Sequence, residues 1–248
     1  ISDNKDFTFK PNIYFNNDIM LQNEYRQVNK NSKNITDFSL GKTTNSTKTH
    51  LFSNTQMNLE SNFFDNSDIE LNIETTSNDT YLKNNNISSS INNNSSLLNS
   101  FFDYSASKED LSIETRFEVY EDLTKDKSDR YQYIYPDFSI SKLINTEKNL
   151  KGDLRFTSSG SQKNYDTNVY ESVLVNNFEY NSIPFFLKNG ITNNLKFLLK
   201  NVNTKGEKSA NYKDKLSSEN FASFSFNSSL PLKKVGKNTN SYFTPKAS

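Results

Sequence analysis

The chain of 248 residues contains no cysteine, no tryptophan and one histidine, His50. The absence of cysteine excludes disulfide bonds and thiolate metal sites. A single histidine argues against a histidine-based metal site and against a Ser-His-Asp triad. We therefore expect no metal and no other cofactor, and we expect His50 to lie on a strand surface without a special role.

An excess of one charge and long apolar runs are missing as well. Lys+Arg and Asp+Glu number 29 each, so the formal net charge is +0 and nothing favours nucleic acid as a partner. No run of 18 or more apolar residues is present, which excludes a transmembrane helix. The hydrophobic content of 33% is low enough for a disordered chain, but 20 Phe and 13 Tyr favour a folded one.

The sequence does contain segments in which apolar and polar residues alternate. In DLSIETRFEVYEDL (110–123), apolar residues and Thr115 fall on one parity and mostly charged residues fall on the other. Because successive side chains of a strand point to opposite faces, this segment is predicted to be a strand with one apolar and one charged face. The first face consists of Leu111, Ile113, Thr115, Phe117 and Val119, and the second of Ser112, Glu114, Arg116, Glu118 and Tyr120.

The same pattern recurs along the chain and predicts an all-β fold without a helix. Polar clusters separate the strands and are expected to be turns and loops, including 84–96, 124–130, 158–166 and 203–218. We expect an antiparallel up-and-down meander of about a dozen long strands, in a single domain that covers 1–248. Further alternating segments are 7–15, 19–28, 51–60, 68–75, 191–200 and 220–229.

The predicted strands are long. Several hold their parity for about 9–14 residues, whereas strands of soluble proteins cluster near 5–6 residues. About ten residues, tilted by about 45°, cover the apolar band of about 25 Å in an outer-membrane barrel. The connections also differ in length, from NND (16–18) to the long 203–218 segment, as in transmembrane barrels. Alternation alone leaves a membrane barrel, a soluble β protein and disorder open.

Several motifs carry a resemblance to a known family. SNDTYLKN (77–84) resembles the Asp-Thr-Tyr-Leu-Arg motif of LptD, the lipopolysaccharide-assembly or organic solvent tolerance protein. FTFKPNIYFNNDIMLQNEYRQ (7–27) resembles an early barrel hairpin of that family. The order and spacing of the motifs are similar to the family over nearly the whole chain. The others are 98–123, YQYIYPDFSIS (131–141), SLPLKK (229–234) and YFTPKAS (242–248).

The resemblance implies the N-terminal part of an outer-membrane β-barrel. The chain begins with Ile1, shows no signal peptide and has too few strands for the family's closed barrel, so we expect a partial transmembrane barrel from a longer protein. The implied function is assembly of lipopolysaccharide into the outer leaflet of a Gram-negative cell outer membrane. The implied partners are lipopolysaccharide, outer-membrane lipid, an LptE-like plug lipoprotein, and the periplasmic Lpt bridge through a domain that this segment lacks.

The resemblance also suggests roles for particular residues. Pro11 matches a family position at which proline weakens strand pairing beside the lateral seam, and it is our lateral-gate candidate. A tolerant sheet edge or bulge would explain this proline equally well. The candidates for the lumen-facing side are Glu24, Arg26, Glu114, Arg116 and Glu118, and those for an interfacial aromatic girdle are Tyr131, Tyr133, Tyr135 and Phe138.

Other classes of function stay open. A porin or another outer-membrane channel has the same strand pattern, and a soluble, secreted β-rich adhesin would place the charged faces in water. An enzyme is the weakest class. The paired acids Glu109–Asp110 and Glu121–Asp122 are adjacent in sequence, so on a strand they point to opposite faces and make poor acid/base pairs.

Overall fold

The computed structural model describes residues 2–14, 19–42, 46–146, 151–235, 237 and 239–247. Twelve of its strands are at least nine residues long. These are β1 (Lys5–Ile13), β2 (Ile19–Val28), β3 (Ser32–Lys42), β4 (Thr47–Asn58), β5 (Asn66–Thr76), β6 (Leu97–Lys108), β7 (Leu111–Asp122), β8 (Tyr131–Asn145), β9 (Gly152–Tyr165), β10 (Val169–Ser182), β12 (Thr192–Glu207) and β13 (Ser217–Ser229). The shorter elements are α1 (Tyr81–Asn84), β11 (Phe185–Phe186), β14 (Leu232–Val235), β15 (Asn240–Phe243) and β16 (Lys246–Ala247).

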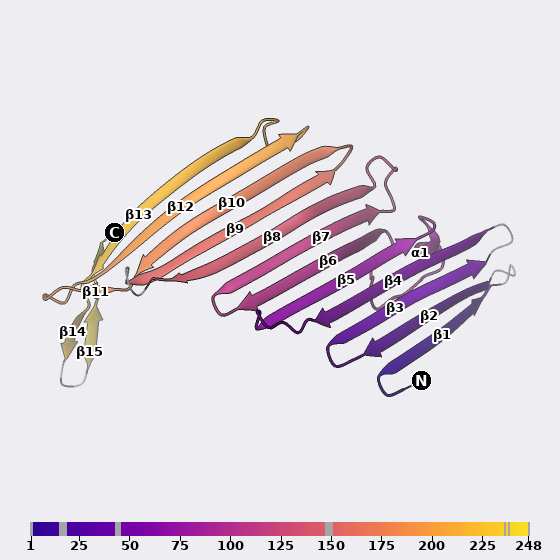
Figure 1. The fold of residues 1–248 in the computed structure, drawn as a ribbon, viewed down its shortest axis with the longest axis horizontal. Coiled ribbons are helices and arrows are strands. Elements are labelled where there is room, and N and C mark those ends of the chain that lie inside the picture. Colours follow the sequence, from indigo (N-terminus) through magenta and orange to yellow (C-terminus); the bar gives the residue numbers. More distant parts are fainter. Residues whose placement is uncertain are drawn as a thin grey trace.

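The long strands form one antiparallel sheet in sequence order, which confirms the predicted all-β meander. Figure 1 shows them side by side in one continuous curved sheet with the two chain ends near opposite edges. The sheet is not closed into a barrel: β1 forms one edge, and β13 pairs beyond β12 only with β16, at Ser228 and Ser229. The hairpin of β14 and β15 is a separate two-stranded sheet.

The cross-strand register gives the sheet two unlike faces. In β7, Phe117 pairs with Phe102 of β6, and Arg116 pairs with Asp103. Directly paired residues share a face, so the two faces of β7 can be followed from strand to strand across the sheet. The apolar face includes Phe9, Leu40, Leu71, Phe102, Phe117, Phe138, Phe178, Phe197 and Phe224. The polar face includes Lys10, Glu24, Asp37, His50, Glu74, Asp103, Arg116 and Asp137.

A bulge in β8 explains a change of parity in the sequence. Tyr131 and Tyr133 are odd-numbered, whereas Phe138 and Ile140 are even-numbered, yet all four lie on the apolar face. The register of β8 against β7 shifts between the pairs Glu118–Ile134 and Arg116–Asp137. One extra residue on the bulged strand returns its side chains to the same face.

Three local predictions differ from the structure. No helix was predicted, but Tyr81–Asn84 form α1, a single helical turn too short to show apolar periodicity. The polar segment 158–166 was predicted to be a loop, but residues 158–165 belong to β9, whose ladder partners β8 and β10 supply backbone hydrogen bonds on both sides. The loop predicted at 203–218 is shorter, because β12 continues to Glu207 and β13 begins at Ser217. The short connection NND (16–18) lies outside the described residues.

The short and the long connections noted in the sequence do not lie at opposite ends of the sheet. The β1–β2 and β12–β13 connections both follow strands that run in the same direction, so they lie at the same end. We call this the strap end, because the longest connection between neighbouring strands, residues 77–96 between β5 and β6, is also there. Within the described residues, no helix has the length and apolarity needed to span a membrane.

The strap, residues 77–96, folds back over the polar face and covers the main buried apolar cluster. Its helix α1 lies beside β4 (Figure 1). Tyr81 and Leu82 from the strap pack with apolar side chains from the sheet and adjacent loops. The apolar core therefore lies mainly on the otherwise polar face, while the apolar face has no second layer over it in the described part of the chain. The cluster consists of Met20, Phe52, Tyr81, Leu82, Leu98 and Leu123.

Candidate functional site

The polar face beneath the strap holds a buried hydrogen-bonded network around His50. The Nδ1 atom of His50 lies 2.5 Å from Ser39 Oγ, and its Nε2 atom lies 3.2 Å from Asp37 Oδ1. Gln22 Nε2 donates to both carboxylate oxygens of Asp37, at 3.1 and 3.0 Å. His50 is only 2% exposed, so the prediction that it lies on a strand surface without a special role is wrong in its placement.

Tyr81 closes this network from the strap side. Its hydroxyl lies 2.8 Å from Ser39 Oγ, and burial raises the pKa of the phenol, so the hydroxyl stays neutral. The ring leaves room for no side chain at Gly41, because a Cβ atom there would lie 2.9 Å from Tyr81 Cε2. The glycine in β3 therefore permits the close approach of the strap.

Ser39, His50 and Asp37 resemble a catalytic triad in composition, but the site does not suit nucleophilic catalysis. Ser39 is 1% exposed and its hydroxyl already contacts Tyr81. A nucleophile needs a reacting atom about 3 Å away in an accessible site. The hollow under the strap is lined by Phe52, Leu82 and residues of the strap. The network consequently fixes the strap to β3 and β4.

Two further carboxylates also meet the strap. Ser90 Oγ donates to Glu24 Oε2 at 3.2 Å, and Asn92 Nδ2 donates to Glu74 Oε2. Glu24 is also paired with Arg26 at 2.5 Å, and Glu74 accepts from Asn72 and from the backbone N–H of Asn99. Each of these nearly buried acids therefore has both a sheet partner and a strap partner.

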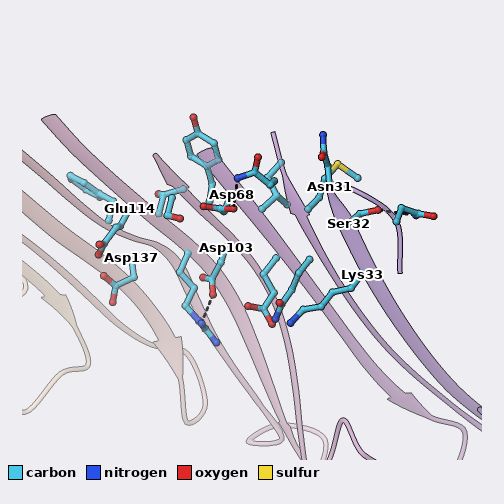
Figure 2. Close-up of a pocket in the computed structure, with 18 of the residues that line it drawn as sticks. Asn31, Ser32, Lys33, Asp68, Asp103, Glu114 and Asp137 are labelled. Carbon is cyan, nitrogen blue, oxygen red and sulfur yellow. Dashed lines mark hydrogen bonds and ion pairs between the residues drawn. The ribbon is translucent and has the colours of Figure 1, made fainter. Parts of the chain in front are cut away.

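The other half of the polar face is open and hollowed. The hollow measures about 760 Å³ and extends across β3 to β8 (Figure 2). Arg116 lies 2.6 Å from Asp103 Oδ2 and 2.7 Å from Glu118 Oε1, and its guanidinium carbon lies 3.9 Å from the centre of the Phe101 ring. The wall of the hollow is rich in carboxylates, but it also includes the apolar residues Val28, Met57, Ile69 and Phe138. Its acidic residues are Asp68, Glu70, Asp103, Glu114 and Asp137.

The lumen-facing candidates all lie on this polar face, in two places. Glu24 and Arg26 form one ion pair near the strap, and Arg116 and Glu118 form another beside the open hollow. Glu114 lines the hollow and is exposed. Glu24 and Glu118 are buried, so neither is a freely solvated charge. Among the described residues, no group of three or more His, Cys, Asp or Glu is arranged to hold a metal ion.

Three of the aromatic candidates in β8, all tyrosines, form a contiguous group. The rings of Tyr131 and Tyr133 stack with centroids 6.0 Å apart, and Tyr133 meets Tyr135 edge to face at 5.8 Å. Tyr131 also donates to Glu121 Oε1 at 3.0 Å. Phe138 follows after the bulge. Rings of this kind beside polar partners are typical of an apolar–aqueous boundary.

Pro11 lies in β1, which is an edge strand, opposite Leu21. Proline lacks a backbone N–H and is tolerated at sheet edges. The local position therefore agrees with the edge explanation, while the role in a lateral gate stays a prediction.

On the apolar face, the large side chains form an oblique belt. Residues that pair directly from strand to strand form a register row. One such row is continuous from Ser32 on β3 to Ser218 on β13, over nine strand-to-strand steps. On β3, Phe38 and Leu40 lie six and eight residues from the row toward the strap end, whereas on β13 Phe224 and Phe226 lie six and eight residues from it toward the opposite end. The row is Ser32, Met57, Ile69, Tyr104, Thr115, Phe138, Gly160, Leu174, Asn203 and Ser218.

This displacement gives the angle between the belt and the strands. A shift of about 14 residues at about 3.3 Å each, over nine spacings of about 4.8 Å, corresponds to a strand tilt of about 45°. Strands of barrels tilt by about 35–45° from the barrel axis. If the strands of this sheet were tilted as in a barrel, the large apolar side chains would thus lie at one level along the barrel axis.

An asparagine ladder borders the belt on the strap side of β9 to β13. Ser158 Oγ donates to Asn176 Oδ1 at 2.8 Å, and Asn201 Nδ2 donates to Asn220 Oδ1 at 2.9 Å. These residues occupy one register row, next to the apolar row of Phe156, Phe178 and Leu199. On these strands a polar row therefore borders the belt, although β10 still has Leu174 beyond it.

Comparisons with protein-family models and with curated proteins find no match to this chain. The family resemblance therefore rests only on the motifs quoted above.

Sequence reasoning missed most of the network under the strap. Asp37, Ser39 and Glu74 were not singled out, because an isolated polar residue within a strand gives no signal of what will cover it. His50, Phe52 and Asn54 have the same parity and therefore share one face of the sheet. This parity was the one signal in the sequence that His50 lies beside a buried apolar residue.

Proposed function

We propose that this chain is part of an LptD-type outer-membrane translocon that assembles lipopolysaccharide in a Gram-negative cell. Its apolar face contacts outer-membrane lipid, and its polar face lines a lumen along which the sugars pass. The open sheet is one section of a larger barrel wall, and lipid A leaves through a lateral seam between strands. The chain performs transport and has no catalytic role.

The oblique belt is the observation that carries the membrane part of this proposal. Phe9, Phe117 and Phe224 are 59%, 44% and 69% exposed, and nothing in the described chain covers their face. A soluble sandwich would need a second sheet over this surface. Lipid would cover this surface without a second sheet, because a lipid-facing barrel wall is apolar on the outside and polar on the inside.

The resemblance to LptD carries the choice of lipopolysaccharide. The motifs at 7–27, 77–84 and 131–141 follow one another as in that family. In this proposal the polar face also meets an LptE-like plug lipoprotein, and lipopolysaccharide arrives from the periplasmic Lpt bridge through a further domain. A general outer-membrane channel is the second candidate, because the charged hollow beside Arg116 would suit any polar solute.

Photocrosslinking separates the translocon from the channel. A photoreactive amino acid at Arg26 or Arg116 of the full-length protein in growing cells is expected to capture lipopolysaccharide, because both side chains lie on the polar face. The same probe at Phe117 serves as the control and is expected to capture membrane lipid. Correct membrane insertion without lipopolysaccharide capture at either polar-face position would favour the channel.

Pro11 provides a test of the lateral seam. Replacing Pro11 by alanine restores a backbone N–H on the edge strand and is expected to strengthen strand pairing by about 0.5–1.5 kcal/mol. Release of lipopolysaccharide to the cell surface should slow accordingly, as measured by pulse-labelling. Asn12→Ala, at the next position of β1, is the control. Export that is unchanged in Pro11→Ala would remove Pro11 from the gate.

A further inference from the structure

The strap divides into two parts that are held very differently. The proximal part contains α1, where Tyr81 and Leu82 are each 2% exposed. It is also fixed by an ion pair of 2.6 Å between Asp79 Oδ2 and Arg130 Nη2, from the loop before β8. The distal part, residues 86–95, contributes only Ile87 and Ile91, which are partly buried against the core cluster. The apolar attachment is therefore concentrated in the proximal part.

The distal strap is loosely packed against the sheet. A hollow of about 340 Å³ lies beneath it and is lined by Phe52, Leu82 and residues of the strap itself. Where a gap separates two surfaces, the dispersion contacts across it are lost. Asn86, at the junction with α1, has φ of 48°, in the left-handed region that asparagine tolerates. This residue follows Asn85, the C-cap of α1, and is a natural pivot.

Release of the distal strap leaves few sheet groups unsatisfied. Glu24 keeps Arg26, Asp37 keeps Gln22 and His50, and Glu74 keeps Asn72 and Asn99. The strap groups that dissociate are the polar ends of Ser90 and Asn92, the carbonyl of Ser88 and the buried hydroxyl of Ser89, which contacts Asp37. Water can satisfy each of them once the segment has lifted. A hydrogen bond exchanged for water costs only about 0.5–1.5 kcal/mol.

We propose that residues 86–95 form an inner gate that lifts from the polar face about Asn86 while α1 stays docked. The closed state is the one described here. Lifting uncovers the carboxylates of Glu24, Asp37 and Glu74 and joins their part of the polar face to the open hollow beside Arg116. That this movement admits lipopolysaccharide sugars rests on the proposed function, whereas the movement itself does not.

The lack of native cysteine permits a direct test in the full-length protein. Single cysteines are introduced at Ser89, the buried residue of the distal strap, at Ser39, under the α1 anchor, and at the exposed Asn93 as a reference. Thiol labelling by a small maleimide is expected to be fastest at 93, intermediate at 89 and slowest at 39. Leu82→Cys, in α1, is a second anchor reporter in case Ser39→Cys fails to fold.

Weakening the contacts of the gate sharpens the test. Adding Ser90→Ala or Asn92→Ala to the Ser89→Cys chain should speed its labelling by about two- to tenfold per contact removed. Labelling at position 39 should not change, and Asn94→Ala is the control substitution. Equal protection at 89 and 39 would mean a fixed strap, and equally fast labelling at both would mean that the whole strap detaches. Either result overturns the proposal, whatever the outcome of the lipopolysaccharide crosslinking.

Discussion

Replacing Phe117 by arginine is expected to destabilise the membrane-inserted protein by about 2–4 kcal/mol, the cost of arginine on the lipid side of a barrel near mid-bilayer. Phe117 lies within the apolar belt on β7 and is 44% exposed. In lipid, a charged guanidinium there has no partner and loses its hydration. Denaturant unfolding of the full-length protein from lipid bilayers measures the difference.

Glu114→Arg is the matched control for this substitution. Glu114 lies on the same strand, three residues away, on the polar face beside the open hollow, and it is exposed. A change there is expected to stay within about 0.5 kcal/mol, as for most surface substitutions. If the two arginine variants were equally stable, the apolar face would not contact lipid.

Replacing Tyr81 by alanine is expected to release the strap, with a loss of about 3–5 kcal/mol, as found when large buried aromatic side chains are truncated. The ring is 2% exposed, and its removal leaves a cavity above Gly41 and takes a partner from Ser39. The loss is local, because the strand ladders do not depend on this ring. Amide hydrogen exchange of residues 81–92 measures the opening of the strap.

Tyr81→Phe separates the ring from the hydroxyl. It keeps the packing and removes only the contact with Ser39, so the loss should be about 1 kcal/mol. A strap that exchanges equally slowly in wild type and in Tyr81→Ala would show that α1 does not anchor it. The inner gate would then lack its fixed point as well.

The strands were predictable because their parity is a local property of the sequence. The prediction of a strand at 19–28 matches β2 (Ile19–Val28), and the alternating segment 110–123 contains β7. The segment 158–165 failed because its side chains are polar on both faces, so that its place in the sheet depends on β8 and β10. The bulge in β8 could be read from the change of parity between Tyr133 and Phe138 only once the register was known.

The site under the strap could not be predicted from local pattern. The segment 84–96 is Asn/Ser-rich and was correctly expected to lack strands, but nothing in it indicates that it covers the polar face. Its docking depends on the register that brings Gln22, Asp37 and His50 together from three strands. Tyr81 and Leu82 were likewise visible only as part of a family motif, since one helical turn has no apolar periodicity.

A scan along β7 in the full-length, membrane-embedded protein tests the central claim most directly. Nitroxide labels on single cysteines at Ile113, Thr115 and Phe117 should be relaxed mainly by oxygen, which concentrates in lipid. Labels at Ser112, Glu114 and Arg116 should be relaxed mainly by a water-soluble nickel complex. The account predicts an accessibility that alternates with a period of two residues along this strand. Equal access of the nickel complex to both sets, or the opposite alternation, would contradict it.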